Sequence, residues 1–476
     1  MDVKNYIDIY NKQQRKLDDA AQSLSSLKKT NQVGGAPISS GASFFSKLRS
    51  GMKRIIAKSV GWYCEGIYEQ QNIINRRNTQ LLEELTQNQM LMSEMLEMIA
   101  KENGIDLPQR KAADGAALKG RVFQLVSELK YGDAVGNDVM SIKRALTESG
   151  YETAVYAYKI HPRVPLSGVY HVNYLKDLQP DDLVIYHVAS EEAVADVFMN
   201  LTCKKVVRYH NITPAEFFKA YDKSTSRRIA GGIGQVISFG KCADYAMADS
   251  EFNKQDLLKY GYKCPIDVVP VLVPFEDYEQ AADQNVIDRF SDGKTNVLFV
   301  GRIAPNKKFE DLIKCFAEYK RSFNSNSRLI LAGSYDENDP YYRHLLEVVK
   351  SEGVDDVQFT GHISFAGILG CYRAADIFLC LSEHEGFCVP LLEAMKFELP
   401  IIAFNSTAVP YTLGDAGILV DDKSSKNVAK ELDRLVKSPE LQKKLIENGK
   451  TQLEKYQYET VKEQIVKSIE KMLDCE

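Results

Sequence analysis

From Gly120 onward, short apolar runs alternate with longer amphipathic stretches of helical period. A short apolar run bounded by turn residues is typical of a buried strand, and alternation with helices is typical of a parallel sheet. The first series of predicted strands comprises residues 122–126, 154–158, 183–187, 205–209 and 267–270. The second series comprises residues 297–300, 329–333, 357–359, 377–381 and 401–404. Two such series predict an α/β protein with two doubly wound parallel-sheet domains that face a cleft.

The same pattern indicates where the domains begin and end. We expect an amino-terminal Rossmann-like domain at residues 119–272 and a second Rossmann-like domain at residues 273–455. An amphipathic helix follows in residues 456–476.

Residues 1–104 are rich in Gln, Asn, Glu, Lys and Met and have almost no strand pattern, which predicts an α-helical extension. A cluster of Gly, Pro and Ser indicates a linker at residues 31–43. Apolar positions at helical spacing, interleaved with Lys and Arg, predict a basic amphipathic helix at residues 44–62. Such a helix lies in an anionic membrane surface or packs its apolar stripe on the catalytic body or on a partner helix.

Apolar residues at heptad-like spacing predict a coiled coil at residues 67–99, with Gln71, Asn78 and Asn88 on the same seam. Polar layers of this kind fix the register of a coiled coil. We therefore expect a homo-oligomer or a coiled coil with a partner protein, and a lone surface helix is the alternative.

Composition narrows the class of protein. A hydrophobic content of 44% and a charged content of 26% are globular values, so large-scale disorder is excluded. The net charge of −5 argues against a general nucleic-acid binder. There is no run of eighteen apolar residues and no signal-peptide pattern, and the nine cysteines lack C-x-x-C spacing. We expect a cytoplasmic protein with reduced thiols and no zinc site, in contact with the inner face of the cell membrane if residues 44–62 bind lipid.

The most informative segment is residues 382–395, where Glu385 and Glu393 stand eight positions apart. The apolar run 377–381 before it predicts a buried strand, and a helix is expected to begin near Leu391. Glu385 would then lie at the carboxyl end of a strand and Glu393 on the first turns of the next helix. Amides of the intervening loop would face the crevice in which open α/β sheets bind ligands. This arrangement suits a nucleotide-linked sugar, with amides for a diphosphate and carboxylates for the sugar and the ribose.

The segment resembles the E-x7-E motif of retaining glycosyltransferases with the GT-B fold, family 4, or glycosyltransferase group 1. Other segments resemble the same family in the same order: a glycine-rich loop at residues 131–138, a strand-end histidine in residues 208–213, and Gly301, Arg302 and Lys307 after a strand. The resemblance extends over most of the chain from about Lys119. It implies that the domain at residues 119–272 lies on the acceptor side, that the domain at residues 273–455 binds the nucleotide sugar, and that the helix at residues 456–476 crosses back to pack on the first domain. The variants in the glycine-rich loop and around Glu385 are most similar to those of mannosyltransferases in surface-polysaccharide assembly.

The resemblance implies roles for the residues of the second domain. Arg302 and Lys307, which follow Gly301, are assigned to the donor diphosphate, where negative charge develops on the leaving group. Glu385 is expected to accept hydrogen bonds from hydroxyls of the donor sugar, and Glu393 from the ribose. Taken alone, the two cations would be surface charges on an ordinary loop, and Glu393 would be a solvated acid of a first helical turn.

The loop between the two glutamates is expected to bind the donor through its amides. Its residues are Gly386, Phe387, Cys388 and Val389, and Pro390 follows near the helix start, where a missing N–H does no harm. Cys388 departs from the glycine more usual in the family, and we interpret it as a small filler beside the donor.

Three residues of the first domain complete the predicted site. Gly132 and Gly136 frame a turn after the first strand, where a missing Cβ lets the backbone approach a phosphate or a sugar. His210 ends a predicted strand, and the matching histidine of the family points at the donor sugar. The alternative for His210 is a histidine whose hydrogen bonds are satisfied within the core.

We therefore expect a retaining hexosyltransferase with His210, Arg302, Lys307 and Glu385 as its catalytic residues. The chain has no D-x-D triplet, which predicts a metal-independent enzyme without a cofactor. GDP-mannose is the first expected donor and a UDP-hexose the second. The expected acceptor is a hydroxyl of a growing surface glycan, and acceptors of such pathways are often lipid-linked. The alternatives are a nucleotide-sugar epimerase or hydrolase on the same fold and a non-catalytic scaffold that acts through its coiled coil.

Overall fold

The computed structural model of the chain describes residues 118–189 and 193–474. The predicted linker at residues 31–43, the basic helix at 44–62 and the coiled coil at 67–99 lie outside the described residues. In the part of the chain that is described, no helix is both long and apolar enough to cross a membrane.

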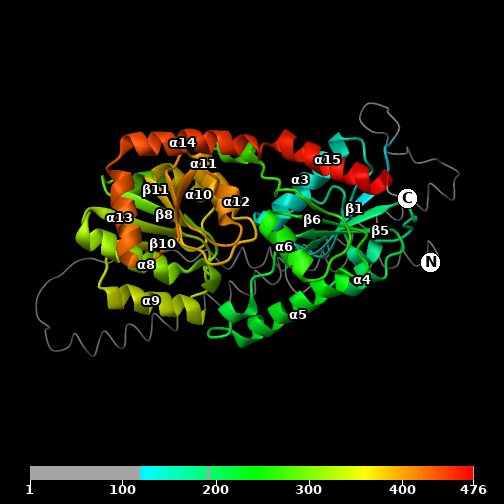
Figure 1. Cartoon of the computed structure of the whole chain (residues 1–476), viewed down its shortest axis with the longest axis horizontal. Helices are drawn as coiled ribbons and strands as arrows, with labels where there is room; N and C mark the ends of the chain where they lie inside the picture. Colours follow the sequence, from blue (N-terminus) through cyan, green and yellow to red (C-terminus); the bar gives the residue numbers. More distant parts are fainter. Residues whose placement is uncertain (1–117, 190–192, 475–476) are drawn as a thin grey trace, which may run out of the picture. The chain divides into compact units, whose positions relative to one another are not determined.

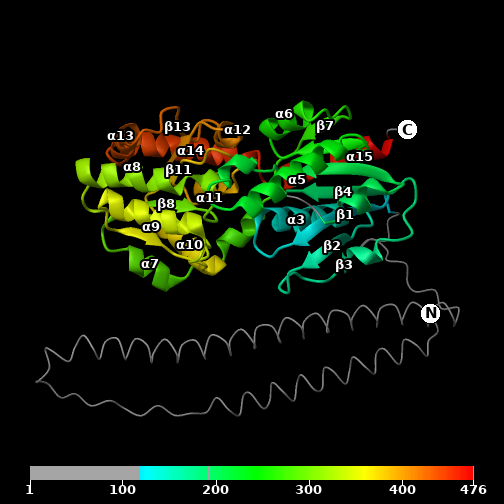
Figure 2. The same cartoon turned by 90° about the horizontal axis from the view of Figure 1, so that it is seen from below.

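The first domain is built on a seven-stranded parallel sheet with the order β3-β2-β1-β4-β5-β6-β7. Its strands are β1 (Val122–Leu129), β2 (Val155–Ile160), β3 (Val169–His171), β4 (Leu183–Val188), β5 (Lys204–Tyr209), β6 (Tyr245–Ala248) and β7 (Ile266–Val268). Its helices are α3 (Ala134–Glu148), α4 (Ala195–Met199), α5 (Lys223–Phe239) and α6 (Glu251–Lys259), with 3-10 turns η1 (Val172–Tyr174) and η2 (Ala215–Phe217). Figure 2 shows β4, β1, β2 and β3 side by side in this order.

The second domain has a six-stranded parallel sheet with the order β10-β9-β8-β11-β12-β13. Its strands are β8 (Thr295–Val300), β9 (Ser327–Ala332), β10 (Val357–Phe359), β11 (Ile377–Cys380), β12 (Ile401–Phe404) and β13 (Gly417–Val420). Its first helices are α7 (Gln284–Phe290), α8 (Phe309–Ser322), α9 (Pro340–Glu352) and α10 (Phe365–Ala374), with the 3-10 turn η4 (Pro305–Lys307). The later helices are α11 (Val389–Lys396), α12 (Val409–Leu413), α13 (Ser425–Val436) and α14 (Pro439–Glu454). Figure 1 shows this sheet and its helices as a separate body from the first sheet.

The two parallel sheets confirm the predicted α/β class with two doubly wound, Rossmann-like domains. The sequence pattern did not predict β3 and β13, one edge strand of each sheet, nor β6, which lies inside the first sheet. β3 and β13 are only partly buried along most of their length, so neither has the continuous apolar run by which a central strand is found. β6 is fully buried but has only four residues, which is too short a run to stand out.

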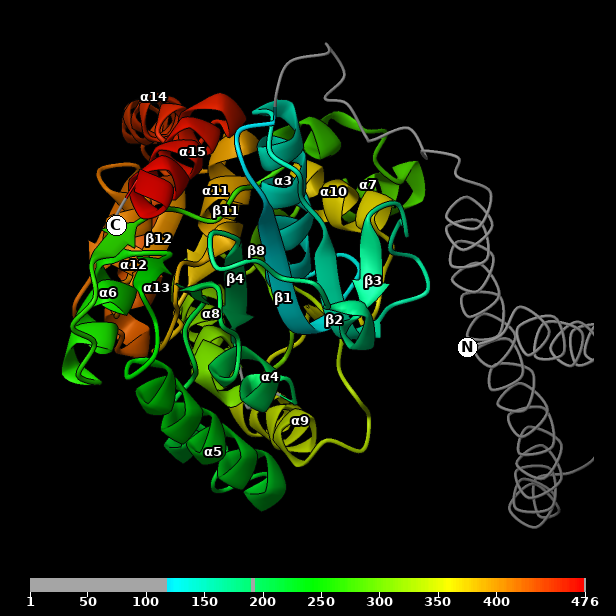
Figure 3. The same cartoon turned by 90° about the vertical axis from the view of Figure 1, so that its right-hand side faces the viewer.

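The final helix, α15 (Tyr458–Asp474), belongs to the core of the first domain although it follows the second domain in sequence. Its apolar face buries Val461, Ile465, Ile469 and Met472 in one cluster with residues of β1, β4, β5 and β6. Lys462 pairs with Glu148 of α3 at 2.8 Å, and Lys471 pairs with Asp267 of β7 at 2.9 Å. Figure 3 shows α15 running beside α3 on one side of the sheet.

The segment that connects β7 to α7 contains the 3-10 turn η3 (Phe275–Glu279) and is attached to both domains. Glu276 pairs with Arg144 of α3 in the first domain. Glu279 pairs with Lys396 of α11 in the second domain at 3.0 Å. The connection therefore contacts α11, the helix that carries Glu393.

Candidate active site

The loops after β8 and β11 meet because these strands pair in parallel, so their carboxyl ends lie at the same edge of the sheet. Asn306, after β8, donates from Nδ2 to the carbonyl of His384 at 3.0 Å. Glu383, after β11, donates from its amide to the carbonyl of Asn306 at 2.9 Å. These bonds hold the two predicted donor-binding loops together.

Lys307 and Glu385 form the ion pair at the centre of this junction. Lys307 Nζ lies 2.5 Å from Glu385 Oε2, and the two side chains are 23% and 7% exposed. Burial acts to lower the pKa of Lys307, but the attraction of Glu385 outweighs it, so the pKa is raised. The amide of Glu385 donates to Thr407 Oγ1 at 2.9 Å, which fixes the loop from the β12 side. The result is a partly exposed ammonium and a carboxylate at fixed positions.

Arg302 lies in the same loop as Lys307 and is exposed. It lines a cavity of about 630 Å³. The lining also includes Ala189 and residues between 212 and 229 of the first domain, and residues 303–305 and residues between 336 and 341 of the second. Its guanidinium can therefore reach a ligand held between the domains.

Gly386 lies at the closest approach of the two domains. A Cβ built on it would be 2.5 Å from the Cβ of Asn211 and 2.7 Å from the carbonyl oxygen of His210. Ser250 Oγ donates to the Gly386 carbonyl at 2.8 Å, and His384 Nε2 lies 2.6 Å from Asn211 Oδ1. This close contact requires a glycine, because any larger residue would push the loop away from the first domain.

The next residues lead into α11. The ring of Phe387 is buried and packs edge-on against Tyr456, so its side chain does not face a ligand. Cys388 is the residue before α11 and has a positive φ of 74°, and Val389 begins the helix. The first amides of a helix have no partner within it, so this turn offers N–H donors to an anion. Cys388 Sγ lies 4.0 Å from Cys380 Sγ, and this neighbour and burial raise the pKa of the Cys388 thiol.

Glu393 is held by two tyrosines. Tyr278 Oη donates to Oε1 at 2.6 Å, and Tyr372 Oη donates to Oε2 at 2.5 Å. Burial raises the pKa of Glu393, and the two hydroxyl donors oppose that rise. Glu393 is therefore a hydrogen-bonded carboxylate, and not the solvated acid that the sequence left as the alternative.

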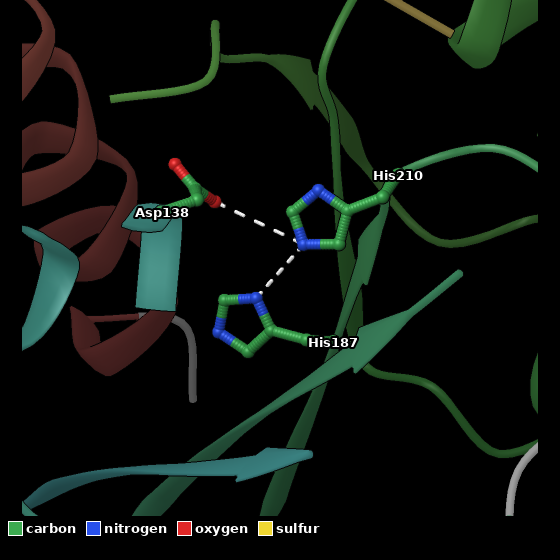
Figure 4. Close-up of side chains that lie close together, drawn as sticks. All are labelled: Asp138, His187 and His210. Atoms are coloured by element: carbon green, nitrogen blue, oxygen red, sulfur yellow. Dashed lines mark hydrogen bonds and ion pairs between the residues drawn. The ribbon is translucent and has the colours of Figure 1, made fainter. Parts of the chain in front are cut away.

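His210 follows β5 and lies in a buried polar cluster, with 3% of its side chain exposed (Figure 4). Its Nδ1 lies 2.9 Å from Asp249 Oδ2, and its Nε2 lies 2.9 Å from His187 Nδ1. Both ring nitrogens thus have partners inside the first domain. A direct hydrogen bond from His210 to a donor sugar would require the ring to give up its hydrogen bond to Asp249 or to His187.

Asp138, His187 and His210 present ligand atoms within 4.8 Å of one another, a spacing that could hold a metal ion. Arg208, however, is fully buried and lies 3.1 Å both from Asp138 and from Asp249. A guanidinium already balances these carboxylates, which disfavours a divalent cation there. A second group, Cys380, Glu385 and Cys388, has the same spacing, but its carboxylate is already paired with the ammonium of Lys307.

Gly132 and Gly136 have backbone roles at the start of α3. Gly132 has a φ of 78°, which favours glycine. A Cβ on Gly136 would lie 2.1 Å from the carbonyl oxygen of Lys130, so only glycine fits there. Asp133 caps α3 by accepting from the Gly136 amide at 2.7 Å. Donor contacts of the two glycines remain predictions.

Sequence reasoning missed Tyr278, Tyr372, Asp249 and His187 as neighbours of the predicted residues. One signal was present: Arg208 stands inside the predicted buried strand 205–209, and a buried charge requires a partner. The tyrosines carried no such signal, because a tyrosine on a helix or in a connection is ordinary.

Residues 282–452 match the family Glycosyl transferases group 1. O-antigen chain mannosyltransferase B of Escherichia coli is 24% identical over 223 residues, which cover 46% of this chain and 57% of that protein. An uncharacterized glycosyltransferase of Haemophilus influenzae is 26% identical over 298 residues, which cover 61% of this chain and 76% of that protein. The crystal structure of Anabaena Alr3699/HepE in complex with UDP and glucose is similar, with a TM-score of 0.58, 14% identity and coverage of 74% of this chain and 100% of that chain.

The two parallel Rossmann-like sheets define the GT-B architecture. Within that class, residues 282–452 match the group 1 glycosyltransferases, and the relatives include an O-antigen mannosyltransferase. This match agrees with the predicted family.

Proposed function

We propose that the protein transfers a hexose from a nucleoside diphosphate sugar to a hydroxyl of a growing glycan, with retention and without a metal ion. The observation that carries the proposal is the Lys307–Glu385 ion pair at the joined ends of β8 and β11, in the loop that also presents Arg302. A fixed cation beside an exposed guanidinium suits a diphosphate leaving group.

In the proposed reaction, the bond between the anomeric carbon and the diphosphate oxygen breaks and a bond to the acceptor oxygen forms on the same face of the sugar. The acceptor proton passes to the departing diphosphate. Arg302, Lys307 and the first amides of α11 stabilise the negative charge on the leaving group. These groups supply positive charge without a metal.

Glu385 would accept hydrogen bonds from the donor-sugar hydroxyls, because its pairing with Lys307 holds the carboxylate at a fixed position in the loop. Glu393 would accept from the ribose hydroxyls. Gly301, Gly132 and Gly136 would let the backbone come close to the donor, and the amides of Gly386, Phe387, Cys388 and Val389 would contact the distal phosphate and the sugar.

The donor is proposed as GDP-mannose first and a UDP-hexose second. The similarity to O-antigen chain mannosyltransferase B supports the first, and the similarity to a protein crystallised with UDP and glucose supports the second. The proposed acceptor is a surface glycan, lipid-linked if residues 44–62 contact a membrane.

A thermal-shift panel tests this proposal directly. The full chain is heated with GDP, UDP, ADP or dTDP, each with and without EDTA. We expect one nucleotide to raise the melting temperature and the shift to persist in EDTA. A shift that disappears in EDTA contradicts metal independence, and no shift with any nucleotide favours the scaffold alternative. R302A is the matched variant and should lose most of the shift, since Arg302 is exposed and lines the cavity.

A further inference from the structure

The Glu393 carboxylate is fixed at both oxygens by hydroxyls that come from two different parts of the fold. Tyr278 lies on η3, in the connection between the domains, and Tyr372 lies on α10. Their hydroxyls lie 2.6 Å and 2.5 Å from Oε1 and Oε2 respectively. Each carboxylate oxygen has two acceptor directions, so each can receive one further hydrogen bond.

Both tyrosines are held so that their hydroxyls keep this direction. The ring of Tyr372 stacks on Phe397 with centroids 5.0 Å apart and an interplanar angle of 4°. The ring of Tyr278 packs edge-on against Phe365 at 5.3 Å. Burial raises the pKa of each tyrosine, so both remain protonated donors.

The two hydroxyls also affect the charge of Glu393. Burial favours the protonated acid, whereas hydrogen bonds from Tyr278 and Tyr372 favour the carboxylate. A carboxylate is a stronger acceptor for a sugar hydroxyl than the protonated acid, because charge-assisted hydrogen bonds are stronger. Removal of either hydroxyl would therefore weaken Glu393 as an acceptor even though Glu393 itself is unchanged.

We propose that Tyr278 and Tyr372 are positioning residues for ribose recognition, which hold Glu393 oriented and ionised to accept from the ribose hydroxyls of the donor nucleotide. The inference rests on the proposed function, since it takes Glu393 as the ribose acceptor. Tyr278 thereby links the connection between the domains to nucleotide binding. The competing account is a purely structural cluster that ties η3 and α10 to α11.

The test compares a nucleoside diphosphate with its 2′,3′-dideoxy analogue on the full chain. The nucleotide is whichever of the ribonucleotides GDP, UDP or ADP gives the largest thermal shift. Dissociation constants are measured by calorimetry for the unaltered protein and for Y278F and Y372F, which keep the packed ring and remove only the hydroxyl. Y319F is the control, because Tyr319 is buried in the same domain and its hydroxyl meets Asn324.

We expect the unaltered protein and Y319F to bind the ribonucleotide at least about tenfold more tightly than the dideoxy analogue. In Y278F and in Y372F this preference should fall to about threefold or less, chiefly through weaker binding of the ribonucleotide. A purely structural cluster would lower the melting temperature and leave the preference unchanged.

Three results overturn the inference while leaving the proposed function intact. They are an unchanged preference in folded Y278F and Y372F, equal binding of the two nucleotides by the unaltered protein, and failure of both variants to fold. If only one variant folds, the preference of that folded variant decides. Failure of every nucleotide to bind overturns the proposed function, and the inference with it.

Discussion

Lys307 and Glu385 depend on each other at the residue scale, because removal of either would leave the other without its ion-pair partner in a mostly buried site. K307M keeps a side chain of similar length and removes the ammonium. We expect the initial rate of sugar transfer to fall about 100- to 1,000-fold, since the positive charge that stabilises the leaving group is lost. Initial rates at saturating donor measure this effect.

K314M is the control for K307M, because Lys314 is an exposed lysine of α8, the helix that follows the same loop. It should transfer sugar at the unaltered rate. A K307M protein with near-normal activity would remove Lys307 from the diphosphate site.

Gly386 gives a prediction about steric fit. The G386A side chain would meet Asn211 Cβ at 2.5 Å, so the loop must move away from the first domain. We expect a loss of transfer activity of about tenfold or more, because a displacement of about 1 Å can cost about 100-fold in rate. Steady-state kinetics report the loss.

The matched glycine is Gly234 of α5, which has nothing within 4 Å of a built Cβ. G234A should keep full activity and gain up to about 1 kcal/mol of stability, because alanine is the better helix former. Equal activity in G386A and G234A would show that the contact between Gly386 and Asn211 is not needed for transfer.

Individual residues also show where sequence reasoning ends. The spacing of Glu385 and Glu393 predicted a strand end and a helix; Glu385 lies in the loop that follows β11, and Glu393 lies on α11. Spacing could not reveal that Tyr278, 115 positions before Glu393, donates to it. Nor could it reveal that Asp249 and His187 occupy both ring nitrogens of His210. Partners brought together only by tertiary packing leave no local pattern.

At the scale of elements, most central strands were predictable, whereas the edge strands β3 and β13 and the four-residue central strand β6 were not. β11 and β12 are buried almost throughout and show as apolar runs, whereas β13 is mostly half-buried. A half-buried strand of four residues is too short to establish an alternating pattern. Such a strand is identified only in the folded structure, where a neighbouring strand supplies its hydrogen-bond partners.

α15 carries a prediction about the stability of the first domain. Ile465 is fully buried in the same cluster as Val122 and Leu183. I465A should lower the free energy of unfolding by about 2–5 kcal/mol. By hydrogen exchange, β1 and β4 should lose protection while β8 and β11 keep it, because the cavity opens in the first domain. K467A, at an exposed position of α15, is the control and should change neither.

At the scale of the whole molecule, His384 links the two domains and gives a pH dependence. Its Nε2 lies 2.6 Å from Asn211 Oδ1, and burial lowers its pKa to about 4. The folded pKa is below the unfolded value of about 6.5, so the folded state favours neutral histidine. Its stabilising effect is complete above pH 6.5 and is lost as the pH falls toward 4.

Urea unfolding between pH 7.5 and pH 4.5 measures this effect. The unaltered protein is expected to lose stability as the pH falls over this interval. In H384Q this loss should be smaller by up to about 3 kcal/mol. H362Q, at an exposed position, should leave the pH profile unchanged. An unchanged profile in H384Q would assign the acid sensitivity to other groups.

The place of α15 has a consequence for how the protein is made. A ribosome releases the strands of the first domain long before it synthesises the helix that covers them, and the whole second domain emerges in between. The nascent first domain therefore exposes the apolar surface later covered by Ile465 and Ile469. During that interval it is a client for chaperones, and translation that stops before α15 yields a protein with an open core.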